Sequence, residues 1–161
     1  MPVAPTVLDL EIGTVRLSAA LCRDLAPHSC ERLMNMLPYH GTVIHARWSG
    51  EALWSPLSAV WPAGQHLPCE RATCEPKPGD ILLYAGDLSE PELLIPYGTA
   101  RFSSKAGLLE GNPVLRIDDP LPALAELGRC VLWQGAMRFQ IGGARCAPRA
   151  AERTPPSEHP P

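Results

Sequence analysis

Two short segments near the start of the chain alternate regularly between side chains of opposite character, and this alternation constrains the fold more than any other feature. In residues 6–12, one face of the predicted strand is mostly apolar, with Thr6, Leu8, Leu10 and Ile12. The other face carries Val7, Asp9 and Glu11. Residues 15–21 alternate in the same manner after a break at Gly13. The two segments together predict a β-hairpin.

The next segment changes to a helical period. Apolar residues recur there at spacings of three or four, namely Ala26, Cys30, Leu33, Met34 and Leu37. Pro27 suits the first helical turn, where its missing N–H costs nothing, and Pro38 ends the helix. We expect this helix to be the only long one in the chain.

The rest of the chain reads as short strands separated by turns and one long loop. Further strands are expected at residues 42–48, 81–84, 92–97, 114–117, 130–134 and 136–141. Five prolines mark residues 55–78 as a long loop, and residues 121–127 are expected to form one or two helical turns. About eight strands, many turns and one main α-helix after the first hairpin predict a mainly β fold, a closed β-barrel capped by that helix.

Length and composition favour one globular domain, because the chain has 161 residues, of which 45% are apolar and 19% charged. We place this domain at residues 1–146 and expect the Pro-rich residues 147–161 to form a disordered tail. The net charge is only −3 and the basic residues are scattered, which argues against a nucleic-acid partner. No apolar run approaches the roughly 20 residues of a membrane span. No secretory signal is visible, so a cytoplasmic location is expected.

The six cysteines are expected to be free thiols in a reducing compartment, although a pairing of Cys69 with Cys74 stays open. His66 lies close to these two cysteines in the sequence, but the spacing matches no standard zinc site and lacks a fourth ligand. The sequence contains no nucleotide-binding, haem or kinase motif. We therefore expect neither a metal nor another cofactor.

The strongest functional signal follows the predicted helix, where Arg47, Trp48 and Trp54 lie within eight positions of one another. Arginine grips carboxylate or carbonyl oxygens, and tryptophan stacks flat groups, so this set suits a ligand pocket. The alternatives are an arginine that forms an ion pair, with Glu51 for example, and tryptophans that fill the core.

Catalytic roles are assigned to Arg47, Glu51 and His45. Glu51 follows a Ser-Gly turn and would act as a general base if burial or a like charge raised its pKa. His45 alternates with Arg47, which places both on one face of the predicted strand. A solvated Glu51 and a packed, hydrogen-bonded His45 are the alternatives.

Three further aromatic residues, Tyr84, Tyr97 and Phe102, are assigned to ligand binding, with packing inside the barrel as the alternative. Ser103 and Ser104 precede Lys105, but no strained turn marks either serine as a nucleophile.

Several motifs resemble the cyclophilin-like proteins, and the likeness extends over roughly residues 5–142. Residues 25–37 resemble the first helix of cyclophilins, and residues 127–135 resemble a late cyclophilin strand. The closer similarity is to compact bacterial and archaeal cyclophilin-like proteins of unassigned function, which share a Pro-Gly-Asp turn, a short apolar strand and a strand ending in Tyr-Gly. Here these motifs are residues 78–84 and 92–98, and residues 101–112 resemble one branch of that group.

The resemblance implies a cyclophilin-like barrel and raises prolyl isomerisation as an activity. Cyclophilins with that activity carry Phe-His-Arg, whereas this chain has His45-Ala46-Arg47, with the arginine displaced by one step. Such a shift reverses the face of a strand unless a bulge restores it. The Gln-Gly-Gly-Asp and Gly-Ser-Gln-Phe-Phe-Ile motifs are missing.

Three functions follow from these patterns. The first is a protein or accessory module that binds a small carboxylate or amide. The second is an enzyme, a hydrolase or isomerase, that anchors such a molecule on Arg47 and uses Glu51 or His45. The third is a peptidyl-prolyl cis-trans isomerase. The expected partner is a small-molecule ligand, and assembly of a homo-oligomer through edge strands near Pro96 stays open.

Overall fold

The computed structural model describes residues 4–118 and 120–147. The barrel strands are β1 (Thr6–Ile12), β2 (Val15–Leu21), β3 (Tyr39–His45), β4 (Gly50–Pro56), β5 (Asp80–Tyr84), β6 (Glu92–Ala100), β9 (Asn112–Arg116) and β10 (Met137–Cys146). The remaining elements are the short strands β7 (Ser103–Ser104) and β8 (Gly107–Leu108) and the helices α1 (Pro27–Asn35) and α2 (Leu121–Gln134).

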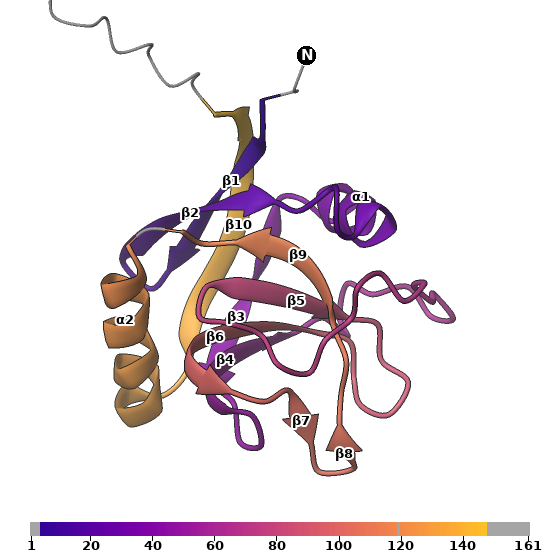
Figure 1. Cartoon of the computed structure of the whole chain (residues 1–161). Helices are drawn as coiled ribbons and strands as arrows, with labels where there is room; N and C mark the ends of the chain where they lie inside the picture. Colours follow the sequence, from indigo (N-terminus) through magenta and orange to yellow (C-terminus); the bar gives the residue numbers. More distant parts are fainter. Residues whose placement is uncertain (1–3, 119, 148–161) are drawn as a thin grey trace, which may run out of the picture.

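Eight antiparallel strands close into a barrel in the order β1-β10-β3-β4-β6-β5-β9-β2, which confirms the predicted mainly β barrel (Figure 1). The first hairpin forms as expected, and its residues Leu8, Leu10 and Ile12 are buried. Strands β7 and β8 make a separate hairpin outside the barrel. The two ends of the described chain lie side by side, because Thr6 in β1 pairs with Cys146 in β10.

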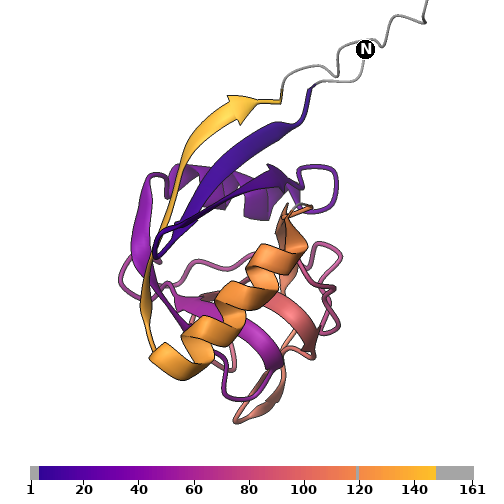
Figure 2. The same ribbon diagram turned by 90° about the vertical axis from the view of Figure 1, so that its left-hand side faces the viewer.

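The helices lie at opposite ends of the barrel (Figures 1 and 2). Helix α1 forms close to its predicted place and buries Cys30 and Leu33 in the main core. Helix α2 covers the other end with Leu124, Leu127 and Val131. The barrel interior is therefore filled with side chains and closed at both ends, so a ligand site has to lie on its outside.

Two expectations about the second half of the chain are wrong. The chain has a second helix, longer than the first, because residues 121–134 form α2 in place of a helical turn and a strand. The run around Val131 suits a strand locally, but its apolar residues also fall at helical spacing and face the barrel, and tertiary packing decides. The helix ends at Gly135, whose φ of 95° favours glycine. The resemblance of residues 127–135 to a cyclophilin strand fails for the same reason.

The strand β4 is not among the predicted elements, because the sequence indicates a turn at Gly50 and the Pro-rich loop from Ser55 onwards, with no element between them. In the structure β4 pairs with β3 on one side and β6 on the other, so it lies in the middle of the sheet. The predicted number of strands agrees with the barrel only because one missed strand replaces one false strand.

A buried carboxylate joins the Pro-rich loop to helix α1. The Glu70 oxygens accept hydrogen bonds from the backbone N–H groups of His28 and Ser29, at 2.8 and 2.9 Å, and from the Ser29 hydroxyl at 2.6 Å. Asn112 in β9 extends the network, because its amide donates to the Ser29 hydroxyl and to the carbonyl of Pro68. Glu70 thus satisfies the free N–H groups of the first helical turn, a position that favours negative charge.

Burial alone would raise the pKa of Glu70, but the hydrogen bonds from Ser29 and His28 outweigh burial and hold the pKa below its usual value. A lowered pKa contributes stability that is present above the unfolded-state pKa and lost as the pH falls through the folded-state value.

We predict that Glu70→Gln lowers the free energy of unfolding at pH 7 by about 1–3 kcal/mol, because the helix loses a charged acceptor. Urea denaturation measures the change, and Glu75→Gln at a nearby exposed position is the control. The variant should also lose less stability than the natural protein between pH 6 and pH 3. Equal stability of Glu70→Gln and the control would contradict this role of Glu70.

Candidate functional site

A pocket of about 360 Å³ lies on the outer face of β3, β4 and β6, beside the β7–β8 hairpin. Its wall includes Arg47, Trp48, Trp54, Glu92 and Lys105. The structure therefore brings together three of the residues assigned from the sequence, Arg47, Trp48 and Trp54, and adds two that had no assigned role.

The alternation of β4 and β6 explains where this pocket lies. Leu53 and Ile95 pair with each other and face the barrel core, whereas their neighbours Trp54 and Leu94 pair on the outer face. The outer face carries a second hydrophobic cluster composed of Ala52, Leu82, Tyr84, Leu94, Phe102 and Leu109. The central strands are thus buried on both sides, and the pocket lies against the outer cluster.

Ser49 fixes one wall of the pocket to another. Its hydroxyl donates to the carbonyl of Ser103 and accepts from the N–H of the same residue, both at 3.1 Å. Its carbonyl accepts from the N–H of Arg101 at 2.9 Å. These bonds hold the turn that carries Arg47 and Trp48 against the β7–β8 hairpin, whose turn carries Lys105.

Arg47 lies beyond the end of β3, and its guanidinium has no ion pair or hydrogen bond among the described residues. Trp48 is 56% exposed although it is a large aromatic residue, and Trp54 is half-buried on β4. Ligand-binding surfaces typically combine exposed aromatic rings with unpaired charged groups, as the indoles and the guanidinium do around this pocket.

His45 and Tyr97 lie on the opposite side of the sheet from this pocket. Nδ1 of His45 is 2.9 Å from the carbonyl of Ala46, and Nε2 is 2.8 Å from the Tyr97 hydroxyl. The carbonyl can only accept, so Nδ1 carries the proton and Nε2 accepts from Tyr97. The expectation that His45 shares a face with Arg47 is wrong, because β3 ends at His45 and the chain then bends.

Tyr97 is buried beneath helix α2, where the absence of a side chain at Gly128 lets the aromatic ring approach the helix backbone. Burial raises the pKa of the Tyr97 hydroxyl, with a smaller contribution from the Glu51 carboxylate. These contacts give His45 and Tyr97 a packing role and place neither in the pocket.

Glu51 is exposed and also lies outside the pocket. Its carboxylate accepts a hydrogen bond from the N–H of Thr99 at 3.0 Å and forms no ion pair with Arg47. Tyr84 and Phe102 pack edge to face in the outer cluster, and the Tyr84 hydroxyl accepts from the N–H groups of Asp87 and Leu88. Tyr84 and Phe102 therefore support the pocket from below without lining it.

Two acidic residues line the pocket, Glu90 and Glu92, and Glu92, the first residue of β6, is the buried one. Glu92 is only 7% exposed, and its carboxyl group, which is open to the pocket, forms no hydrogen bond or ion pair in residues 4–118 and 120–147. Burial, and then the charge of Glu90, raise the pKa of Glu92 to about 7. The sequence held one signal for it, an acidic residue at the start of an otherwise apolar strand.

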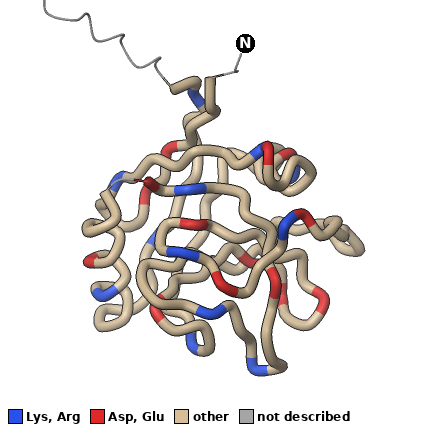
Figure 3. Tube along the Cα trace, viewed as in Figure 1, with Lys and Arg blue, Asp and Glu red and all other residues tan. Residues whose placement is uncertain are grey.

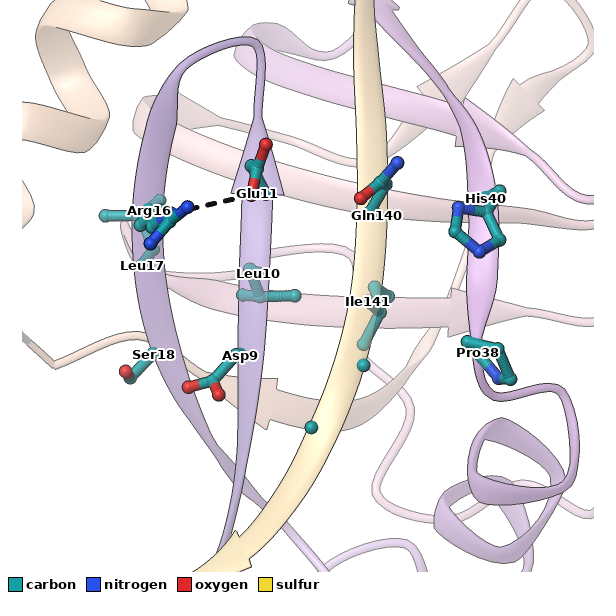
Figure 4. A pocket seen from close by; sticks show the side chains of 12 residues that line it. Asp9, Leu10, Glu11, Arg16, Leu17, Ser18, Pro38, His40, Gln140 and Ile141 are labelled. Atoms are coloured by element: carbon teal, nitrogen blue, oxygen red, sulfur yellow. Dashed lines mark ion pairs between the residues drawn. The ribbon is translucent and has the colours of Figure 1, made fainter.

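A larger hollow, of about 500 Å³, lies on the outside of the sheet near the first hairpin, as Figure 4 shows. Its charged residues neutralise one another or nearby groups: Arg16 pairs with Glu11 at 3.6 Å, and Asp9 pairs with Arg145 at 3.2 Å. Along the part of the trace that Figure 3 colours, basic and acidic residues are interspersed. The hollow near the first hairpin is therefore a polar sheet face with paired charges, and the pocket at Arg47 is the better candidate.

The structure also bears on metals and membranes. No three His, Cys, Asp or Glu side chains lie close enough to hold a metal ion in the part of the chain that the structure describes, and His66, Cys69 and Cys74 form no such group. Neither α1 nor α2 is long and apolar enough to cross a membrane.

The raised pKa of Glu92 predicts a pH-dependent stability. The unfolded chain releases this proton near pH 4.5, whereas the folded protein holds it up to about pH 7. Stability from Glu92 is therefore fully present below the first value and lost as the pH rises through the second, a change on the order of 3 kcal/mol.

Urea denaturation at pH 5 and pH 8 measures this change, with Glu92→Gln as the comparison and Glu110→Gln as an exposed control. We expect the natural protein and the control to weaken over this range more than Glu92→Gln does. Parallel pH profiles for all three proteins would show that folding does not raise the pKa of Glu92.

The structure of McbB in complex with tryptophan is similar, with a TM-score of 0.65 and 22% sequence identity over 94% of this chain. This chain corresponds to only 50% of the length of that one. The crystal structure of the Mimivirus cyclophilin matches with a TM-score of 0.49 and 16% identity, over 91% of both chains.

The curated proteins contain no match to the sequence. A family model described as "Protein of unknown function (DUF3830)" matches residues 8–142, nearly the whole of the described barrel. The closed β-barrel expected from the motifs is confirmed. The chain therefore belongs to the DUF3830 family.

Proposed function

We propose that the protein binds a small carboxylate or amide in the pocket of Arg47, Trp48, Trp54 and Lys105. The observation that carries this proposal is that two cations and two indoles line one hollow while neither cation has a protein partner in the described residues. A guanidinium donates two parallel hydrogen bonds to a carboxylate, and it also binds an amide carbonyl. The indoles supply flat apolar surface for the rest of the ligand.

The position of Arg47 favours recognition of a ligand over a structural role. An arginine that stabilises the fold would have an acidic partner, but Glu51, the nearest acidic residue in the sequence, bonds to Thr99 instead. The Ser49 bonds hold the Arg47 turn in place without using the guanidinium. Holding the backbone that carries Arg47 in place lowers part of the entropic cost of binding.

An enzyme acting on a small carboxylate or amide is the second candidate, and Glu92 is the observation that favours it. A general acid or base works best with a pKa near the working pH, which Glu92 has. Glu51 and His45 do not line the pocket. In such an enzyme Arg47 would anchor the substrate, and Glu92 would transfer a proton to or from it as general acid or base. Turnover of a bound ligand, followed by NMR over time, tests it.

Prolyl isomerisation keeps some support, because Arg47 shares the pocket with apolar residues such as Ile44, Trp54 and Leu94. That reaction needs an arginine near the amide nitrogen and an apolar seat for the proline ring. A chromogenic prolyl tetrapeptide, assayed with the natural protein and Arg47→Ala, tests this activity directly.

The binding proposal predicts a specific effect of Arg47→Ala. A thermal-shift screen would use 4-methylbenzoate, phenylacetate, phenylacetamide and a cyclic ureide, with L-tryptophan added because McbB was solved with it. A ligand at 100 times its dissociation constant stabilises by about 2.7 kcal/mol. Loss of the guanidinium should weaken a carboxylate ligand by about 10-fold or more, because charge-assisted hydrogen bonds are lost.

Arg138→Ala is the matched control, because Arg138 is exposed on β10, away from the pocket. We expect both variants to melt like the natural protein without ligand, and only Arg47→Ala to lose the ligand-induced shift. A shift retained in Arg47→Ala, or absent from the natural protein for every compound, would refute the proposed site.

A further inference from the structure

We propose that the pocket is built for a dipolar ligand, an elongated amino carboxylate that lies over Trp54 with its carboxylate toward Arg47 and Lys105 and its ammonium group at Glu92. This inference rests on the proposed function and adds the chemical class of the ligand. It assigns Glu92 the selection of the ligand by its hydrogen-bond donor.

The first argument is the unpartnered carboxyl group. Glu92 is more than nine-tenths buried, lines the pocket, and forms no side-chain hydrogen bond or ion pair among the described residues. No fully enclosed side-chain oxygen or nitrogen of the described residues lacks a partner, so the Glu92 oxygens are open to the pocket. Burial of the rest of the side chain removes much of their hydration, which costs free energy when the group is ionised. A ligand with a donor would complete this environment.

The contrast with Glu70 shows that this arrangement is specific to the pocket. Glu70 is about as buried as Glu92, at 8% against 7% exposed, but it accepts hydrogen bonds from His28 and Ser29. The fold therefore provides partners for one buried carboxyl group and leaves the other facing a hollow.

The second argument is the order of the groups along the sheet. Glu92 pairs with Pro56 at one end of β4, whereas Gly50, next to the Arg47 turn, pairs with Ala100 at the other. Trp54 lies between them and pairs with Leu94 on the pocket face. The indole thus separates an acidic end from a basic end.

The charges around the pocket match this polarity. Glu90, just before β6, also lines the pocket, and its charge raises the pKa of Glu92 further after burial. The Glu90 carboxylate accepts a hydrogen bond from the Ser58 hydroxyl. Arg47 and Lys105 come from the turns at the other end and do not lower the pKa of Glu92. His66 pairs with Asp87, and neither of these residues lines the pocket. A zwitterion complements both ends, whereas a simple anion meets the carboxyl groups unfavourably.

Three probes of the same shape test the inference by calorimetry at pH 8: 4-(aminomethyl)benzoate, 4-methylbenzoate, which lacks the ammonium group, and 4-methylbenzylamine, which lacks the carboxylate. We expect the zwitterion to bind about 10-fold more tightly than either. In Glu92→Gln this advantage should disappear while 4-methylbenzoate binds at least as well as before. Glu110→Gln, at an exposed position, should behave like the natural protein.

The natural protein also supplies a test that does not depend on any variant. Because Glu92 must be ionised to hold an ammonium group, affinity for 4-(aminomethyl)benzoate should rise between pH 6 and pH 8, whereas affinity for 4-methylbenzoate should not. Equal affinity for the two benzoates, or an equal loss of both in Glu92→Gln, would overturn the role of Glu92 and leave the carboxylate site standing. If none of the probes binds, both the proposed function and this inference are wrong.

Discussion

Burial of the central strands on both faces is the constraint on which the rest of this structure depends. The inner residues of β4 and β6 pack with the core, and the outer residues pack beneath the chain that follows β6, where Phe102 and Leu109 are buried. A strand buried on both sides reads as a continuous apolar run, and β6 does so from Leu93 to Tyr97. Because the barrel interior is full, the outer cluster provides the floor on which polar groups form a pocket.

The two buried glutamates show how one fold uses the same side chain in different ways. Hydrogen bonds give Glu70 a lowered pKa and make it part of the framework that holds the Pro-rich loop to α1 and β9. Burial without such bonds raises the pKa of Glu92. The first arrangement stabilises the protein at neutral pH, whereas the second costs stability there and is expected where a site binds a ligand.

Local sequence patterns were sufficient for much of the fold. Alternation specified the first hairpin, and helical spacing with a flanking proline specified α1, because both elements bury one face and expose the other. The pattern misled around Val131, where the same apolar residues fit a strand or a helix and only packing against the barrel decides. The pattern also failed to predict β4, because its tryptophan, serine and proline interrupt the apolar run that marks a central strand.

The candidate site was only partly predictable for a related reason. Arg47, Trp48 and Trp54 are close in sequence and meet in one pocket, but His45 and Glu51, equally close, are directed elsewhere by the end of β3 and by a bond to Thr99. Glu92 and Lys105 are distant in sequence and join the pocket through strand register and the Ser49 contacts. Long-range register of this kind cannot be read from a single sequence.

The four tryptophans allow the most direct test of a ligand site on the outer face of β3, β4 and β6. In ¹⁵N-labelled protein each indole N–H gives its own NMR signal, assigned by single substitutions. Titration with 4-(aminomethyl)benzoate should move the signals of Trp48 and Trp54 and leave those of Trp61 and Trp133, which lie outside the pocket, in place. Movement confined to Trp61 or Trp133, or no movement with this probe or with 4-methylbenzoate, would contradict the account.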